Sequence, residues 1–203
     1  REAFLNTEKK HFFTESLPMI YVTGGSLGSH AINTAVGGIL EKLLEKYTIY
    51  HQTGNAQEHG DYERLSELKK TLPEKLQRRY HLTKFVAPDE VASVLQAASL
   101  IISRSGINTI TEILYFEKPA LLIPLPHGQK NEQLENAKFL EELDLARIKE
   151  QQDLTPETLY TEIEEMMSQL NSYRIKQGAS PGIQKDATEK IIATLFSVAQ
   201  KLP

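Results

Sequence analysis

The feature that most constrains the fold is a regular alternation of short apolar runs with longer amphipathic segments. Apolar runs lie at residues 17–23, 47–52, 81–86, 100–103, 119–124 and 146–149. Segments with helical spacing lie between them, at 26–46, 57–72, 88–98, 108–116 and 131–143, and another begins at Thr155. Because the runs are apolar at successive positions, we expect strands buried on both faces, as parallel strands under helices are. The sequence predicts an α/β fold with a doubly wound, mostly parallel Rossmann-like sheet.

The length of 203 residues suits one α/β domain. We expect residues 1–16 to be a linker segment, 17–182 the Rossmann-like domain and 183–203 a C-terminal helix. A chain that begins with Arg1 instead of methionine is interpreted as a domain of a longer protein. The last helix is expected to pack toward a missing N-terminal domain through its apolar side chains, Ile191, Ile192, Leu195 and Phe196.

Composition excludes several classes of function. Cysteine is absent, so disulfides and thiolate metal sites are excluded, in keeping with a reducing cytoplasm. The net charge of −4 and the lack of a basic block argue against a nucleic-acid partner. No apolar run reaches the roughly 18–20 residues that span a bilayer.

Glycine and hydroxyl residues gather just after the predicted strands, where ligands bind in open parallel sheets. The first such loop, GGSLG, contains Gly24, Gly25 and Gly28, and Ser26 is expected to cap the helix that follows. Glycines allow close approach of a phosphate to the free N–H groups of a helix start. The loop matches neither the dinucleotide fingerprint nor the P-loop, so a tight turn with a cap is the alternative.

The loop RSGINT repeats this device, with Gly106 before a helix that starts near Asn108 or Thr109. A second helix start at the same crevice suits a diphosphate. Glu112 has two interpretations: it caps the first helical turn, or its carboxylate accepts hydrogen bonds from ribose hydroxyls.

Amide side chains follow the fifth predicted strand. Gln133 and Asn136 are three residues apart and share a helix face. Amides donate and accept, which suits sugar hydroxyls, although a solvated first turn is the plainer alternative. His51 and His127 lack partners at metal-ligand spacing, and no DxD-like acidic pair is present. We therefore expect no metal and no cofactor.

In order, the motifs GGSLGSHAIN, HQTG, FV, SRSGINTITEI, PLP and EQLENA resemble those of the MurG family over nearly the whole chain. The resemblance implies the donor-binding C-terminal half of a GT-B glycosyltransferase, an inverting hexosyltransferase. Such enzymes transfer N-acetylglucosamine (GlcNAc) from UDP-GlcNAc to undecaprenyl-pyrophosphoryl-muramyl pentapeptide, converting lipid I to lipid II in peptidoglycan synthesis. A peripheral location on the cytoplasmic face of the cell membrane is implied.

The same resemblance implies roles for individual residues. Arg1 lies near the donor, Ser26 contacts the phosphates, and Val86 holds the uracil through its backbone. Ile107, Asn108 and Thr109 present the helix start to the diphosphate, and Glu112 binds the ribose. The GlcNAc hydroxyls are read by Gln133 and Asn136. Leu27, the pair Ser29-His30 and Glu132 depart from the family pattern and bear on the identity of the donor sugar.

No catalytic base is evident in this sequence, and the resemblance places it in the missing acceptor-binding domain. The isolated chain is therefore expected to bind donor without turnover. Alternatives are a donor-binding subunit of another lipid-linked GlcNAc or glycolipid transferase, a protein resembling UDP-GlcNAc 2-epimerase, and a non-catalytic Rossmann-like interaction domain.

Overall fold

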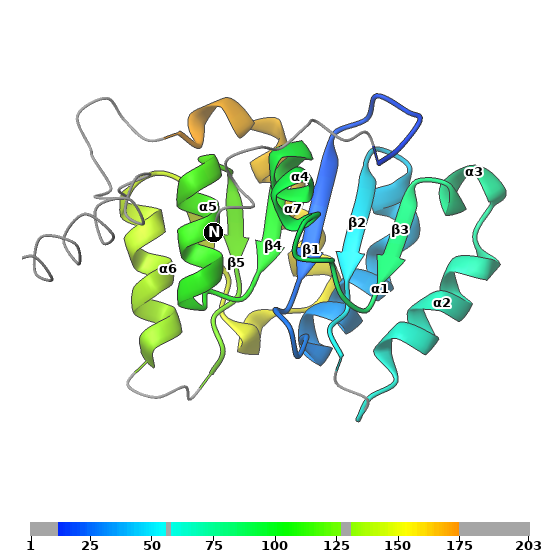
Figure 1. Cartoon of the computed structure of the whole chain (residues 1–203), viewed down its shortest axis with the longest axis horizontal. Helices are drawn as coiled ribbons and strands as arrows, with labels where there is room; N and C mark the ends of the chain where they lie inside the picture. Colours follow the sequence, from blue (N-terminus) through cyan, green and yellow to red (C-terminus); the bar gives the residue numbers. More distant parts are fainter. Residues whose placement is uncertain (1–11, 56–57, 127–130, 175–203) are drawn as a thin grey trace, which may run out of the picture.

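The structure is a computed structural model that describes residues 12–55, 58–126 and 131–174. Its centre is a six-stranded parallel sheet with the order β3-β2-β1-β4-β5-β6 (Figure 1). The strands are β1 (Met19–Thr23), β2 (Thr48–Gln52), β3 (Tyr80–Thr83), β4 (Ala98–Ser103), β5 (Ala120–Leu122) and β6 (Ala146–Ile148). The predicted Rossmann-like fold is confirmed, including an edge strand at Ala146.

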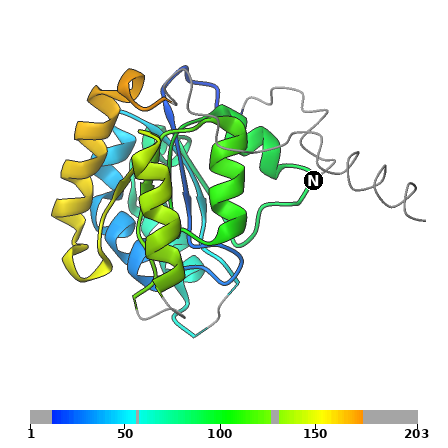
Figure 2. The same ribbon diagram turned by 90° about the vertical axis from the view of Figure 1, so that its left-hand side faces the viewer.

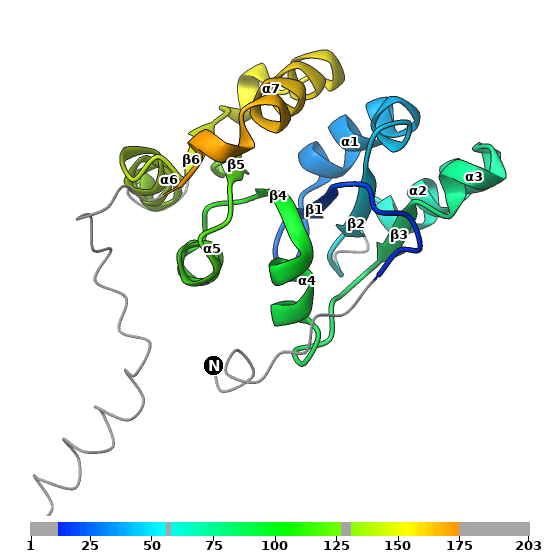
Figure 3. The ribbon, with the colours of Figure 1, turned by 90° about the horizontal axis from the view of Figure 1, so that it is seen from above.

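Helices cover both faces of the sheet (Figures 2 and 3). One apolar core lies under α1 and α7, and the other under α4, α5 and α6, while α2 and α3 flank β3. The helices are α1 (His30–Leu44), α2 (Asp61–Thr71), α3 (Glu74–Gln77), α4 (Val91–Ala97), α5 (Ile107–Phe116), α6 (Glu132–Glu142) and α7 (Pro156–Ser168). No helix in the described part of the chain is long and apolar enough to cross a membrane.

Strand β1 shows why the apolar runs fold as they do. All five of its residues are buried. Ile20 and Val22 pack in the core under α1, while Met19 and Tyr21 pack in the core under α4. Successive side chains of a strand point to opposite faces, so a strand with helices on both sides needs apolar residues at consecutive positions.

The strand order reverses between β1 and β4, which lie side by side in the middle of the sheet. The chain leaves β1 toward α1 on one face and leaves β4 toward α5 on the other. Thr23 and Ser103 are partners at the carboxyl ends of the two strands. The loops that follow therefore separate and open a crevice at this switch point.

Several predicted boundaries were wrong. Ser26 does not cap α1; the cap is Ser29, whose Oγ accepts from the N–H of Ile32 at 3.4 Å. The reason is a turn in the glycine loop, where the Gly28 N–H donates to the Gly25 carbonyl and delays the helix. The third strand ends at Thr83, before Val86, because the Thr83 hydroxyl bonds to the backbone of Phe85.

Other expectations fall outside the described residues. They concern Arg1, most of the 1–16 segment, His127 and the helix expected at 183–203. The predicted domain limits stay predictions. Helix α7 begins as expected, with the Thr155 hydroxyl accepting from the N–H of Thr158 at 3.2 Å and Pro156 in its first turn.

Candidate functional site

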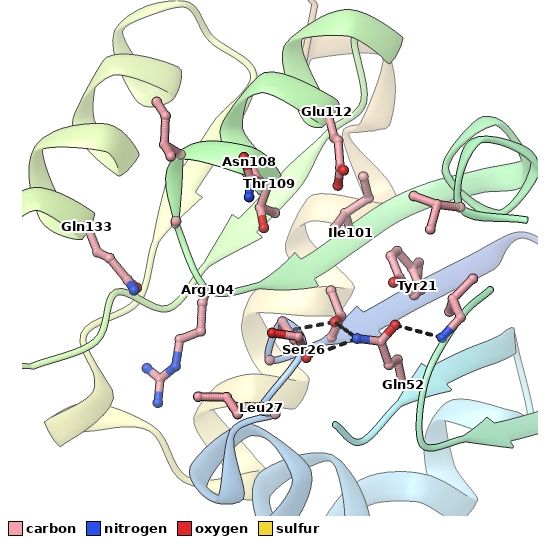
Figure 4. A pocket seen from close by; sticks show the side chains of 18 of the residues that line it. Tyr21, Ser26, Leu27, Gln52, Ile101, Arg104, Asn108, Thr109, Glu112 and Gln133 are labelled. Atoms are coloured by element: carbon pink, nitrogen blue, oxygen red, sulfur yellow. Dashed lines mark hydrogen bonds between the residues drawn. The ribbon is translucent and has the colours of Figure 1, made fainter. Parts of the chain in front are cut away.

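A cavity of about 670 Å³ opens at the carboxyl edge of the sheet, at the switch point (Figure 4). The loops after β1, β3, β4 and β5 contribute to its lining, as does Gln52 at the end of β2. Four of its apolar lining residues are exposed: Leu27, Phe85, Ile107 and Leu125. Most of the predicted site residues line it: Gly24, Gly25, Ser26, Gly28, Val86, Gly106, Ile107, Asn108, Thr109, Glu112 and Gln133.

The loop after β1 packs directly on the loop after β2. Gly28 and Gly54 have φ angles of 84° and 87°, in the left-handed region. A Cβ at Gly28 would lie 2.0 Å from the Thr53 carbonyl oxygen, and a Cβ at Gly54 would lie 2.2 Å from the Gly28 backbone. Two backbones touch here, so both residues must be glycine whatever the cavity binds.

The amide of Gln52, at the end of β2, joins the end of β1 and the loop after it to the loop after β3. Its Nε2 donates to the Thr23 hydroxyl at 3.2 Å and to the Gly25 carbonyl at 2.9 Å. Its Oε1 accepts from the Val86 N–H at 3.0 Å. The sequence placed Gln52 after a strand but assigned it no role. The structure also shows that the Val86 N–H already has a partner inside the protein.

The loop after β4 is open toward the cavity. Gly106 is the N-cap of α5, has an ordinary φ of −66°, and makes no side-chain cap hydrogen bond. A Cβ built on it would meet nothing within 4 Å. The helix starts with no capping side chain, and its first residues, Ile107 to Thr109, line the cavity, so a ligand there could reach its first N–H groups.

Gln133 and Asn136 lie differently from one another. Gln133 lines the cavity, and its Oε1 accepts from the Leu125 N–H at 2.9 Å. Asn136 is not among the lining residues; its Nδ2 donates to the Ser105 carbonyl at 3.0 Å. The Ser105 hydroxyl in turn donates to the Gln133 carbonyl at 2.7 Å. Asn136 thus holds the RSG loop in place, and its contact with a sugar stays a prediction.

Glu112 is half-buried and lines the cavity beside Tyr21. Because α5 begins at Ile107, Glu112 lies in its second turn, and the helix-capping interpretation was wrong. Burial raises the pKa of the Tyr21 phenol, and the nearby Glu112 charge raises it further. The ligand-binding interpretation of Glu112 stays a prediction.

Behind the first loop lies a buried polar network. His51 Nε2 is 2.9 Å from Asn33 Oδ1, and His51 Nδ1 is 2.9 Å from the Tyr80 hydroxyl. The Asn33 Nδ2 donates to the Thr53 carbonyl at 3.0 Å and to Asp61 at 2.9 Å. Burial lowers the pKa of His51 to about 3, so the ring is neutral. His51 therefore has a structural role.

Asp61 is buried at the start of α2. It also contacts His30 and Arg64, each at 2.9 Å. The described residues contain no group of three or more histidine, cysteine or acidic residues placed to hold a metal ion.

The fold and the position of the cavity define a Rossmann-like α/β domain with a site at its switch point. The chain belongs to the family of glycosyltransferase family 28 C-terminal domains, whose model matches residues 19–194.

Similar proteins agree with this assignment. A UDP-N-acetylglucosamine–N-acetylmuramyl-(pentapeptide) pyrophosphoryl-undecaprenol N-acetylglucosamine transferase of Clostridium kluyveri is 34% identical over 182 residues, 89% of this chain and 47% of that protein. The crystal structure of Acinetobacter baumannii MurG superposes with a TM-score of 0.69 and 29% identity, over 91% of this chain and 51% of that chain. The predicted resemblance to the MurG family is confirmed.

This chain spans about half the length of the curated relatives it matches. The structure of UDP-GlcNAc 2-epimerase from Neisseria meningitidis matches with a TM-score of 0.58 at 15% identity, over 92% of this chain and 46% of that chain. At that identity the likeness shows the shared fold alone.

Proposed function

We propose that this chain is the UDP-GlcNAc-binding domain of a glycosyltransferase that makes lipid II from lipid I. One observation carries the proposal: in a family 28 C-terminal domain, the loops predicted to bind nucleotide sugar converge on one cavity at the switch point. Relatives over 30% identical are named as transferases of GlcNAc to a muramyl-pentapeptide lipid.

The lining residues suit the parts of UDP-GlcNAc. The start of α5, at Ile107, Asn108 and Thr109, offers N–H groups and a positive dipole end to the diphosphate. Glu112 accepts from the ribose hydroxyls, and Gln133 contacts the sugar. Since the Val86 N–H is engaged by Gln52, a uracil held by Val86 bonds to its carbonyl oxygen instead.

In the proposed mechanism, this domain stabilises the leaving group, UDP. Charge develops on UDP as the sugar transfers, and fixed donors at the α5 start offset it without a metal ion. The other half of the longer protein binds the lipid-linked acceptor and supplies the base for the acceptor hydroxyl. Because that acceptor is a lipid, we place the reaction at the cytoplasmic face of the membrane, with the donor domain on its aqueous side.

Calorimetric titration in chelator tests the donor. Wild-type chain is titrated with UDP-GlcNAc, UDP-glucose, UDP and ADP, and the Glu112→Ala variant with UDP. We expect binding of UDP and UDP-GlcNAc but not ADP, and a loss of about ten- to hundredfold in the variant, since a hydrogen bond to a charged group contributes about 1.5–3 kcal/mol.

Glu141→Ala, at an exposed position of α6 outside the cavity, is the matched control. Three results would contradict the proposal: a folded chain that does not bind UDP, an affinity for ADP equal to that for UDP, or an unchanged UDP affinity in Glu112→Ala.

A further inference from the structure

Arg104 is the only lysine or arginine among the described residues that line the cavity. It follows β4 directly and lies at the switch point, and Figure 4 shows its guanidinium directed away from Glu112. Two of the lining residues, Glu112 and Glu132, are acidic. Arg104 is thus a single positive charge in the described lining, and the resemblance to the MurG family implied no role for it.

Among the described residues, only neutral groups hold the guanidinium. Its Nη1 donates to the carbonyls of Ile123 at 2.9 Å and Pro124 at 3.1 Å. Its Nη2 donates to the Ser29 hydroxyl at 2.7 Å and to the Gln151 side-chain oxygen. None of the ion pairs among the described residues involves Arg104.

These contacts fix the charge, and no acidic group in the described part of the chain compensates it. Burial lowers the pKa of Arg104 to about 10, so the group is still protonated at neutral pH. A half-buried cation without a carboxylate costs free energy. Its contact with Ser29, the N-cap of α1, places it at the positive end of a helix dipole, which adds to that cost.

The first residue of α5, Ile107, lies three residues after Arg104, and both residues line the cavity. Because Arg104 also contacts Ser29, the N-cap of α1, the positive ends of two helices lie near this arginine. An anion bound there is attracted by all three. The arrangement is unfavourable when the cavity holds only water and favourable when it holds a multiply charged anion. Fixed, preoriented charge of this kind needs no reorganisation on binding.

We propose that Arg104 supplies the fixed positive charge that selects a diphosphate over a less charged ligand in this cavity. The proposal rests on the donor-binding function above and adds the residue that reads ligand charge. Four of the guanidinium N–H groups are already engaged, so Arg104 acts through its charge more than through new hydrogen bonds.

The test uses uridine, UMP and UDP, a series in which ligand charge rises while the nucleoside stays constant. Affinities are measured by NMR titration for the wild-type chain, Arg104→Gln and Arg104→Lys. We expect the ratio of UDP affinity to uridine affinity to fall about tenfold in Arg104→Gln, equivalent to about 1.4 kcal/mol. The same ratio stays within about threefold of wild type in Arg104→Lys, which keeps the charge.

A purely structural role predicts a different pattern. Loss of the four hydrogen bonds would weaken all three ligands alike and leave the ratio unchanged in Arg104→Gln, and that result overturns the proposal. If Arg104→Gln does not fold, the test rests on Arg104→Lys. A tenfold fall in its ratio of UDP affinity to uridine affinity then overturns the proposal. Wild-type chain that binds none of the three contradicts the donor-binding function itself, which separates the two failures.

Discussion

The loops after β1 and β4 both carry glycine before a helix, yet the glycines serve different purposes. In the first loop, Gly28 has a positive φ and touches the backbone of the neighbouring loop, so the fold excludes any side chain. In the second, Gly106 has an ordinary φ and open space around its Cβ position. The fold would accept a side chain at Gly106.

The two loops are also supported differently. In the first, Gly28 packs on Thr53 and Gly54. The buried network of His51, Asn33 and Asp61 holds Thr53 through its carbonyl. The second is held from the side by Asn136, which bonds to the Ser105 carbonyl. The comparison shows that a glycine-rich motif can mark a tightly packed turn or one with open space around it, and that only the packing distinguishes the two.

Substitution of Gly28 should have the largest effect. Gly28→Ala places a Cβ against the Thr53 carbonyl and strains a positive φ, so we expect a loss of about 3 kcal/mol or more of stability, or no folded protein. Gly25→Ala is the matched control, because Gly25 has φ 83° and open space. Urea unfolding of both variants measures the clash as their difference; equal losses would mean that the loops do not touch.

The network behind the first loop should make stability depend on pH. Burial keeps His51 neutral down to about pH 3, whereas the unfolded chain binds a proton below about pH 6.5. The unfolded state then binds more protons, so the free energy of unfolding falls as the pH drops from about 6.5 toward 3. Between about pH 7.5 and pH 5, His51 should account for a loss of about 2 kcal/mol.

Urea unfolding at both pH values checks this for wild type and His51→Gln. The variant should lose less stability on acidification than wild type, even though it is weaker at neutral pH. His59→Gln, at an exposed histidine, serves as control and should follow wild type. An identical pH dependence in His51→Gln would show that this histidine is not the buried titrating group.

Gly106 should show the reverse of Gly28. Gly106→Ala suits the observed backbone and should leave stability unchanged or raise it by about 0.4–1 kcal/mol, because alanine restricts the unfolded chain. The added methyl group enters the space at the α5 start and should weaken UDP binding by about tenfold. Thermal unfolding and calorimetry on the same sample give both values. Unchanged UDP affinity would remove the second loop from the ligand site.

Much of the site was predictable because it follows the strands directly. Apolar runs and glycine punctuation located the loops that hold Ser26, Gly106 and Glu112. Three features escaped the sequence. The cap moved from Ser26 to Ser29, because the turn between Gly25 and Gly28 is set by contact with a distant loop. Asn136 turned away from the cavity to the Ser105 carbonyl. The motif gave no sign that the charge of Arg104 has no acidic partner among the residues that the structure describes.

By itself, the sequence determined the parallel α/β architecture, the positions of the loops and the family to which the chain belongs. These follow from local periodicity and from motifs read along the chain, which need no knowledge of distant neighbours. The tertiary structure decided which glycines are tightly packed and which side-chain amides bond within the protein. It also decided which charge has no acidic partner among the described residues. Those properties depend on residues such as Gly28 and Thr53 or Arg104 and Gln151, which are far apart in sequence and meet only when the sheet has assembled.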